Sequence, residues 1–270
     1  MEIQYLGTAG WYFTASGGAL LIDPYFTRVP LRRLAFGPLV PDAEMVRRYT
    51  PPADWILVSH SHFDHLLDVP VVAQITGAEV YASRQSCDLL RVLGVPPKQM
   101  RPIAAGNRLA LGPFTVEVYE VPHRQMIGRI PAYGPLREGL APPLRARDYR
   151  MRELFSFRVE AGGVRVLVAS GVEREPPVPT DVLLVGADAS RAQLARILSA
   201  VQPRLVLPNH WDDMFRPLSE PARPSLQMPQ TLGLLRRVDL VAWSAHVCEH
   251  APAARVLVPE RFRAYDIRAK

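Results

Sequence analysis

Ser59-His60-Ser61-His62-Phe63-Asp64-His65 follows directly on Trp55 to Val58, an apolar run typical of a buried strand. Four groups that commonly bind metals, His60, His62, Asp64 and His65, thus lie within six residues at a strand end. Neutral imidazoles suit zinc and similar ions, and a carboxylate adds negative charge, so one such loop can serve two adjacent ions. Without a metal, each group would need another partner once buried. The sequence therefore predicts a metal centre here.

Two further histidines are candidates because of where they stand. His123 closes Glu120-Val121-Pro122-His123, and His210 closes Leu205-Val206-Leu207-Pro208-Asn209-His210. Each follows a strand pattern, so each can project from a sheet edge as the first cluster does. Either residue alone would more often be an ordinary structural histidine.

The motif His-x-His-x-Asp-His resembles the signature of the metallo-β-lactamase superfamily. The opening strands, Tyr5 to Gly10 and Leu20 to Pro24, are similar to the branch that includes ascorbate-phosphate lactonases and phospholipase D-type phosphodiesterases. The resemblance implies an α/β (α+β) fold, a four-layer αββα sandwich with the metal site at one edge between two sheets. It also implies a single domain over residues 1–270, made of two similar βα halves.

The same resemblance implies a ligand set. His60, His62 and His123 would form a first metal site, and Asp64, His65 and His210 a second. The expected cofactor is zinc, as one or two ions, with manganese or iron as alternatives. Asp64 and His210 are the candidate catalytic residues, and Asp64 would orient the metal-activated water or accept its proton.

One position departs from the family pattern. A strand there normally ends in Ser-Gly-Asp, whose Asp bridges the two metals, whereas this chain reads Ala169-Ser170-Gly171-Val172-Glu173. Val172 cannot bind a metal. Glu173 could substitute, water alone could bridge, or one ion could be held weakly or not at all. Loss of bridging charge predicts weakened binding at one site.

Periodicity and turn residues predict alternating strands and helices. The predicted strands are Ile3–Leu6, Trp11–Thr14, Ala19–Ile22, Trp55–Val58, Glu79–Ala82, a set within Arg108–Val121, Phe155–Glu160, Val164–Ala169, Asp181–Val185, Arg204–Leu207 and Leu240–Trp243. The predicted helices are Asp42–Tyr49, Val69–Thr76, Ser83–Leu93, Arg191–Val201 and Gln230–Arg237.

The segment from Arg124 to Arg152 is rich in Pro, Gly and Arg and lacks a regular pattern. A long irregular segment inside a compact domain usually has a function. Because it starts beside a candidate ligand, we expect residues 124–152 to form a lid or pocket loop.

Composition limits the class of protein. The chain has 270 residues, 48% of them hydrophobic, enough for a substantial core. We expect a soluble protein without a membrane span, and a cytoplasmic one because the first residues lack a secretory pattern. Cys87 and Cys248 are expected to be buried thiols. The net charge of +6 is the excess of 32 basic residues over 26 acidic ones. The basic residues, 30 arginines and two lysines, are scattered along the chain, which does not favour nucleic acid as a partner.

These observations predict a metal-dependent hydrolase of a small-molecule phosphodiester, ester or lactone. The alternatives are a non-catalytic or divergent member of the fold that lacks the bridging Asp, and a nuclease of the same fold. Asp23 is expected to fix a ligand imidazole, while Asp188, Asp212 and Asp213 could orient His210 or line the pocket. Further pocket or structural residues are Arg124, Arg129, His246 and His250, and a homo-oligomer is left open.

Overall fold

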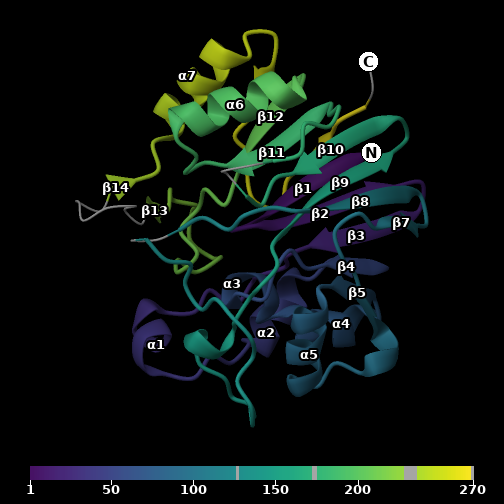
Figure 1. Ribbon diagram of the computed structural model, residues 1–270, viewed down its shortest axis with the longest axis vertical. Coiled ribbons are helices and arrows are strands. Elements are labelled where there is room, and N and C mark those ends of the chain that lie inside the picture. Colours follow the sequence, from purple (N-terminus) through teal and green to yellow (C-terminus); the bar gives the residue numbers. More distant parts are fainter. Residues whose placement is uncertain (126–127, 172–174, 228–235, 269–270) are drawn as a thin grey trace.

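The computed structural model describes residues 1–125, 128–171, 175–227 and 236–268 (Figure 1). Two seven-stranded sheets face each other, and helices cover the outer side of each. This is the four-layer αββα sandwich that the sequence predicts. Among the described residues, no helix has the length and apolar character needed to cross a bilayer.

The first sheet has the order β16-β1-β2-β3-β4-β5-β6. Its strands β1 to β3 are antiparallel, and β3 to β6 run parallel. The bounds are β1 Glu2–Gly7, β2 Gly10–Ala15, β3 Gly18–Ile22, β4 Trp55–Leu57, β5 Glu79–Ala82, β6 Met100–Pro102 and β16 Ala264–Asp266.

The second sheet has the order β15-β12-β11-β10-β9-β8-β7. Strands β7 to β10 are antiparallel, whereas β10, β11, β12 and β15 run parallel. The bounds are β7 Arg108–Leu111, β8 Phe114–Glu120, β9 Phe155–Ala161, β10 Val164–Val168, β11 Val182–Gly186, β12 Leu205–Asn209 and β15 Arg255–Val256. A separate small ribbon pairs β13 Leu226–Gln227 with β14 Arg236–Arg237.

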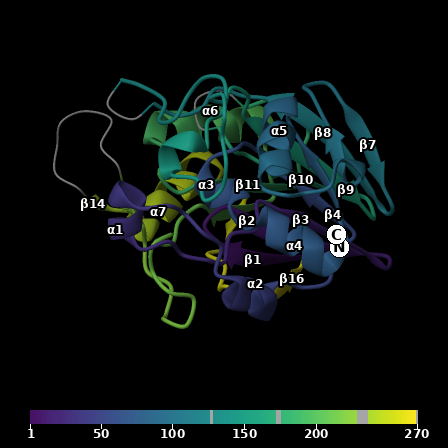
Figure 2. The same ribbon diagram turned by 90° about the horizontal axis from the view of Figure 1, so that it is seen from below.

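Helices form the two outer layers. On the first sheet lie α2 Ala43–Tyr49, α4 Val69–Thr76 and α5 Arg84–Val92, while α6 Arg191–Val201 and α7 Leu240–His250 cover the second (Figures 1 and 2). Two short helices, α1 Leu31–Phe36 and α3 Phe63–Leu66, lie toward the edge where the loops gather.

Strand alternation divides the core. In β3, Leu20 and Ile22 join the cluster between the sheets, while Leu21 packs with the helices outside. Because both faces of the parallel strands are buried, these strands read as unbroken apolar runs.

Most predicted elements are confirmed within a residue or two. The helices at Val69–Thr76 and Arg191–Val201 and the strand Glu79–Ala82 have the predicted bounds. The hairpin of β9 and β10 turns at Gly162-Gly163, both with positive φ, as the glycine pair predicts.

Three expectations are wrong. The predicted strand Leu240–Trp243 is the start of α7, because Asp239 caps it by accepting hydrogen bonds from the next amides. A helix was predicted over 230–237, but Arg236 and Arg237 form strand β14. The rest of that prediction, residues 230–235, lies outside the described residues. Cys87 is buried as expected, but Cys248 is exposed.

Candidate metal centre

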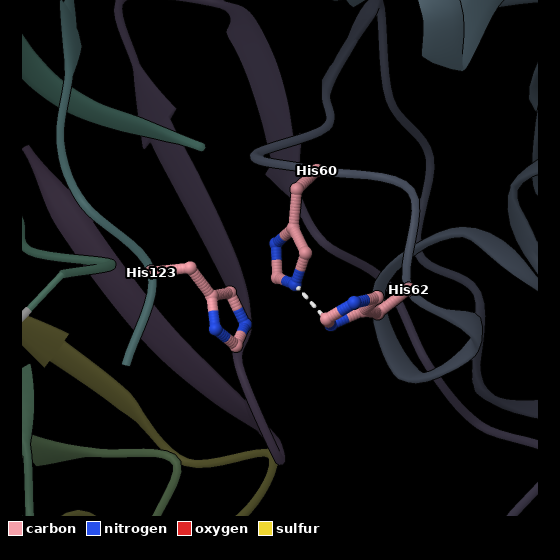
Figure 3. A group of neighbouring side chains, drawn as sticks. All are labelled: His60, His62 and His123. Carbon is pink, nitrogen blue, oxygen red and sulfur yellow. Dashed lines mark hydrogen bonds between the residues drawn. The ribbon is translucent and has the colours of Figure 1, made fainter. Parts of the chain in front are cut away.

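The six candidate ligands converge in space as two groups of three. His60, His62 and His123 offer donor atoms within 4.8 Å of one another, and Asp64, His65 and His210 do the same. Figure 3 shows the three imidazoles of the first group turned toward a common point. These are the two sets that the family resemblance implies. Their role as ligands stays a prediction.

Topology explains why residues so far apart in sequence meet. His60 follows β4, His123 follows β8, and His210 follows β12. Strand β8 is antiparallel to β9, which is antiparallel to β10, and β10 runs parallel to β11 and β12. The carboxyl ends of β8 and β12 therefore share one edge of the second sheet, where the loop after β4 faces them.

Hydrogen bonds leave one nitrogen of each first-group imidazole free for a metal. His62 Nε2 lies 2.9 Å from the Pro131 carbonyl and His123 Nδ1 2.7 Å from the Arg124 carbonyl. A carbonyl only accepts, so these nitrogens carry the protons. The lone pairs then lie on His62 Nδ1 and His123 Nε2.

His60 Nε2 and His62 Nδ1 lie 3.0 Å apart, the contact dashed in Figure 3. His60 Nδ1 contacts the Ser59 hydroxyl at 3.0 Å, and that hydroxyl donates to Asp23 at 2.5 Å. His60 Nδ1 is then the donor, and Nε2 presents a lone pair. Two facing lone pairs repel unless a cation lies beside them, so this geometry fits two ligands of one metal ion.

The second group surrounds a carboxylate. Asp64 Oδ2 lies 3.1 Å from His210 Nε2 and 3.6 Å from His65 Nε2. The other ring nitrogen of His65, Nδ1, donates to Asp23 Oδ2 at 2.8 Å. Asp23 thus fixes the His65 imidazole, as expected, while the role of His65 as a ligand stays a prediction.

Burial and charge set the protonation of these groups. Burial, reinforced by the neighbouring imidazoles, lowers the pKa of His60 well below its usual value and that of His62 to about 4. Burial also lowers the pKa of His123. These rings are neutral at pH 7, the form that binds a metal. Burial opposes ionisation of Asp64 as well, but His65 and His210 beside it hold its pKa below the usual range.

The donor set fits one or two borderline dications. It consists of five imidazoles and one carboxylate, with a further carboxylate, Asp23, behind His65. Burial lowers the pKa of His65, but the charges of Asp23 and Asp64 outweigh it and raise that pKa. The buried negative charge of Asp23 and Asp64 is what a dication would neutralise.

The backbone around His210 is pinned to the first sheet. His210 has a φ of +51°, a left-handed conformation that favours glycine. The Asn209 side chain accepts from the His210 amide at 3.0 Å and from Trp11 Nε1 at 2.9 Å. Trp211 stacks on Tyr5. These contacts hold the backbone of this candidate ligand in its strained conformation.

Three other acidic residues do not join the donor groups. Asp212 accepts from Tyr5 and from the Thr8 amide, Asp213 pairs with Arg223, and Asp188 pairs with Arg124. The hypothesis that they orient the His210 ring is wrong for Asp212 and Asp213, whose bonds go elsewhere, and the alternative that they line the pocket stays a prediction. Arg124 is engaged beside the site, whereas Arg129 is exposed.

Sequence reasoning missed two partners of the site and left one position open. Ser59, which joins Asp23 to His60, directly precedes the motif and could have been suspected. The Pro131 carbonyl, which accepts from His62, belongs to the backbone and has no signal in the sequence. The substitution at Val172, and Glu173 beside it, lie outside the described residues. His246 and His250 lie on α7, outside both donor groups.

Comparison with known proteins gives a family match. The family model described as "Beta-lactamase superfamily domain" matches residues 19–211 of the chain. The UPF0173 metal-dependent hydrolase of Carboxydothermus hydrogenoformans is 34% identical over 131 residues, 48% of this chain and 51% of that protein. Its namesake from Pyrobaculum arsenaticum is 33% identical over 122 residues, 45% of this chain and 49% of that one. The match spans about half the length of these curated relatives.

Solved structures share the fold. Igni18, a metallo hydrolase of Ignicoccus hospitalis, has a TM-score of 0.61 at 16% identity and covers 99% of both chains. An isothiocyanate hydrolase from Delia radicum gut bacteria has a TM-score of 0.62 at 12% identity over 100% of both. CmlA, a diiron β-hydroxylase of Streptomyces venezuelae, has a TM-score of 0.57 at 16% identity, covering 98% of this chain and 54% of CmlA. At these identities the likeness is one of fold, and the fold alone does not decide the metal.

Proposed function

Because the chain belongs to the beta-lactamase superfamily, we propose that it is a metal-dependent hydrolase of a phosphodiester, ester or lactone bond. The names of its curated relatives support hydrolysis in general. The narrower substrate class rests on the similarity of the opening strands to the lactonase and phosphodiesterase branch.

The observation that carries the proposal is the convergence of six donor side chains from three separate parts of the chain. The protons and lone pairs of four of them, His60, His62, His65 and His123, are arranged by Ser59, Asp23 and two backbone carbonyls. Bound zinc, or another dication, would lower the pKa of a bound water to about 7 and polarise the oxygen under attack. Zinc is our first choice, with manganese or iron as alternatives.

Asp64 and His210 are the proposed catalytic residues. Asp64 has one oxygen between His65 and His210, and its pKa is held low, so it is ionised at neutral pH. An ionised carboxylate at this place can orient a water molecule and accept its proton. His210 Nε2 lies 3.1 Å from that same oxygen and helps to fix its position.

Hydrolysis of bis-p-nitrophenyl phosphate, simple lactones and β-lactams by the zinc-loaded protein tests the proposal. We expect turnover of a phosphodiester or a lactone, abolished in His62→Ala and retained in His246→Ala, a histidine outside both donor groups. Zinc binding without turnover of any of these substrates would favour the non-catalytic alternative. Turnover confined to RNA, with salt-sensitive binding, would favour the nuclease.

Elemental analysis counts the ions. Since Val172 stands where a bridging Asp is expected, we predict that dialysed protein retains fewer than two ions per chain. Two tightly held ions would contradict that prediction. A single ion would leave the hydrolase proposal intact, since one dication suffices for the chemistry.

A further inference from the structure

Residues 128–151 are fastened to the rest of the protein through their backbone carbonyls. Gln85 Nε2, on α5, donates to the carbonyls of Gly134 at 3.0 Å and Arg150 at 2.9 Å. The Ser61 hydroxyl donates to the same Arg150 carbonyl at 2.5 Å. These three hydrogen bonds use only the backbone of the loop. Farther along the loop, the side chains of Leu144 and Tyr149 are buried in the cluster outside the first sheet.

The two carbonyls that Gln85 reaches belong to one paired stem. Tyr133 and Met151 form a parallel bridge, the Gly134 amide donates to the Met151 carbonyl at 2.9 Å, and the Met151 amide donates to the Ala132 carbonyl at 3.0 Å. Gln85 thus holds both sides of the stem at once. Pro131 comes directly before the stem, so the stem decides where its carbonyl lies.

That carbonyl touches the metal centre. Pro131 accepts from His62 Nε2 at 2.9 Å, which keeps the proton on Nε2 and the lone pair on Nδ1, beside His60. If the stem moved away, His62 could rotate or take the other tautomer, and its free nitrogen would no longer face the first group. Partners of this kind typically contribute 10- to 100-fold to metal affinity.

We propose that Gln85 is a positioning residue, which clamps residues 128–151 as a fixed wall of the site and thereby orients His62. The inference rests on the proposed function, because it takes His62 to be a ligand. Of the two expectations for this segment, a lid or a pocket loop, it favours the pocket loop, since the described part of the loop is tied to both α5 and the histidine motif.

Gln85→Ala tests the proposal. Peptides covering the stem, residues 131–134 and 150–151, should exchange amide hydrogens at least tenfold faster, and zinc affinity by chelator competition should fall about tenfold. In the zinc-loaded protein, the protonated Nε2 signal of His62 in ¹⁵N spectra should broaden or shift. Gln85→Glu keeps the side-chain size but removes the donors, so it should behave like Gln85→Ala.

Gln99 provides a matched control. Its Nε2 also donates to two backbone carbonyls, Ala73 and Ala78, both at 2.8 Å, but it lies away from the loop. Gln99→Ala should leave loop exchange, the His62 signal and zinc affinity unchanged.

Unchanged loop exchange in Gln85→Ala, or an equal loss of zinc affinity in Gln99→Ala, would overturn the proposal. A Gln85→Glu variant with wild-type behaviour would overturn it too, because side-chain size alone would then hold the loop. Hydrogen exchange and the ¹⁵N spectrum do not depend on turnover. A wild-type protein that binds zinc but hydrolyses none of the substrates would therefore contradict the proposed function without contradicting the role of Gln85.

Discussion

Asp23 serves three donors at once. Its Oδ1 accepts from the Ser59 amide at 2.7 Å, and its Oδ2 accepts from the Ser59 hydroxyl and from His65 Nδ1. It stands directly after β3, in parallel register with β4, so the carboxyl ends of these neighbouring strands bring it to the start of the histidine motif. One buried carboxylate thus orients a candidate ligand in each donor group.

Asp23→Asn should weaken metal binding while the protein remains folded. An amide has one acceptor oxygen and a donor NH₂, so it cannot serve the Ser59 pair and His65 together. We expect zinc affinity to fall about 10- to 100-fold. Chelator competition measures this, with circular dichroism as the check on folding. Unchanged affinity would show that His65 is oriented by other means.

Glu175 is a buried carboxyl beside the second sheet. Burial raises its pKa to about 8, against the opposing hydrogen bond from the Ser156 hydroxyl at 3.0 Å. The folded protein therefore keeps this proton to a higher pH than the unfolded chain, which releases it near 4.5, the ordinary pKa of a glutamate side chain. The stability that this group contributes is full below that value and is lost as pH rises toward 8.

Glu175→Gln should remove this pH dependence. We expect the free energy of unfolding of the metal-free wild type to fall, relative to the variant, as the pH rises from about 5 to about 9. Urea unfolding at the two pH values measures the difference. Parallel pH curves for the two proteins would contradict the prediction.

At the scale of elements, Asp212 joins the segment after β12 to the hairpin of β1 and β2. It accepts from the Tyr5 hydroxyl at 2.7 Å and the Thr8 amide at 2.6 Å, and it lies 3.2 Å from Arg28 Nη2. Both members of the ion pair are almost fully buried. Because His210 lies two residues before Asp212, this contact also fixes a candidate ligand.

Asp212→Ala should cost about 3–5 kcal/mol of unfolding free energy, because it leaves the Arg28 guanidinium buried without its countercharge. Asp88→Ala is the control. Asp88 pairs with Arg91 at 2.8 Å, but both side chains are about half exposed, so its loss should cost about 0–1 kcal/mol. Urea unfolding compares the two. Equal losses would mean that the buried pair contributes no more than a surface pair.

The elements show what sequence patterns can and cannot predict. Helix α4 and strand β5 were predictable because each carries its own periodicity and a glycine marks the turn between them. The start of α7 reads as a strand because Leu240 and Val241 are apolar neighbours, although the Asp239 cap and the spacing of Trp243 and Val247 signal a helix.

The site shows a second limit. The sequence places four candidate ligands in one loop, but it does not say how they divide. In the structure His62 is the N-cap of α3, which carries Asp64 and His65, and the ring centroids of His65 and His60 lie only 4.0 Å apart, so the two groups adjoin. The division of the six candidate ligands into two groups of three was predicted from the family resemblance alone. The tertiary contacts that fix the tautomers, above all the Pro131 carbonyl, have no signature in the sequence.

At the scale of the whole molecule, the site depends on both sheets. The first supplies His60, His62, Asp64 and His65 through the loop after β4, whereas the second supplies His123 and His210 at strand ends. The cluster between the sheets holds these edges in register, and the Asp212 and Asn209 contacts join them beside the site. Neither sheet alone presents a complete donor group.

Anomalous diffraction from a crystal of the zinc-loaded protein, recorded on both sides of the zinc absorption edge, tests the central claim most directly. We predict a strong peak among His60, His62 and His123, or among Asp64, His65 and His210, with a weaker or absent peak in the other group. A zinc peak found only away from these two groups, or no zinc peak at either group, would contradict the account.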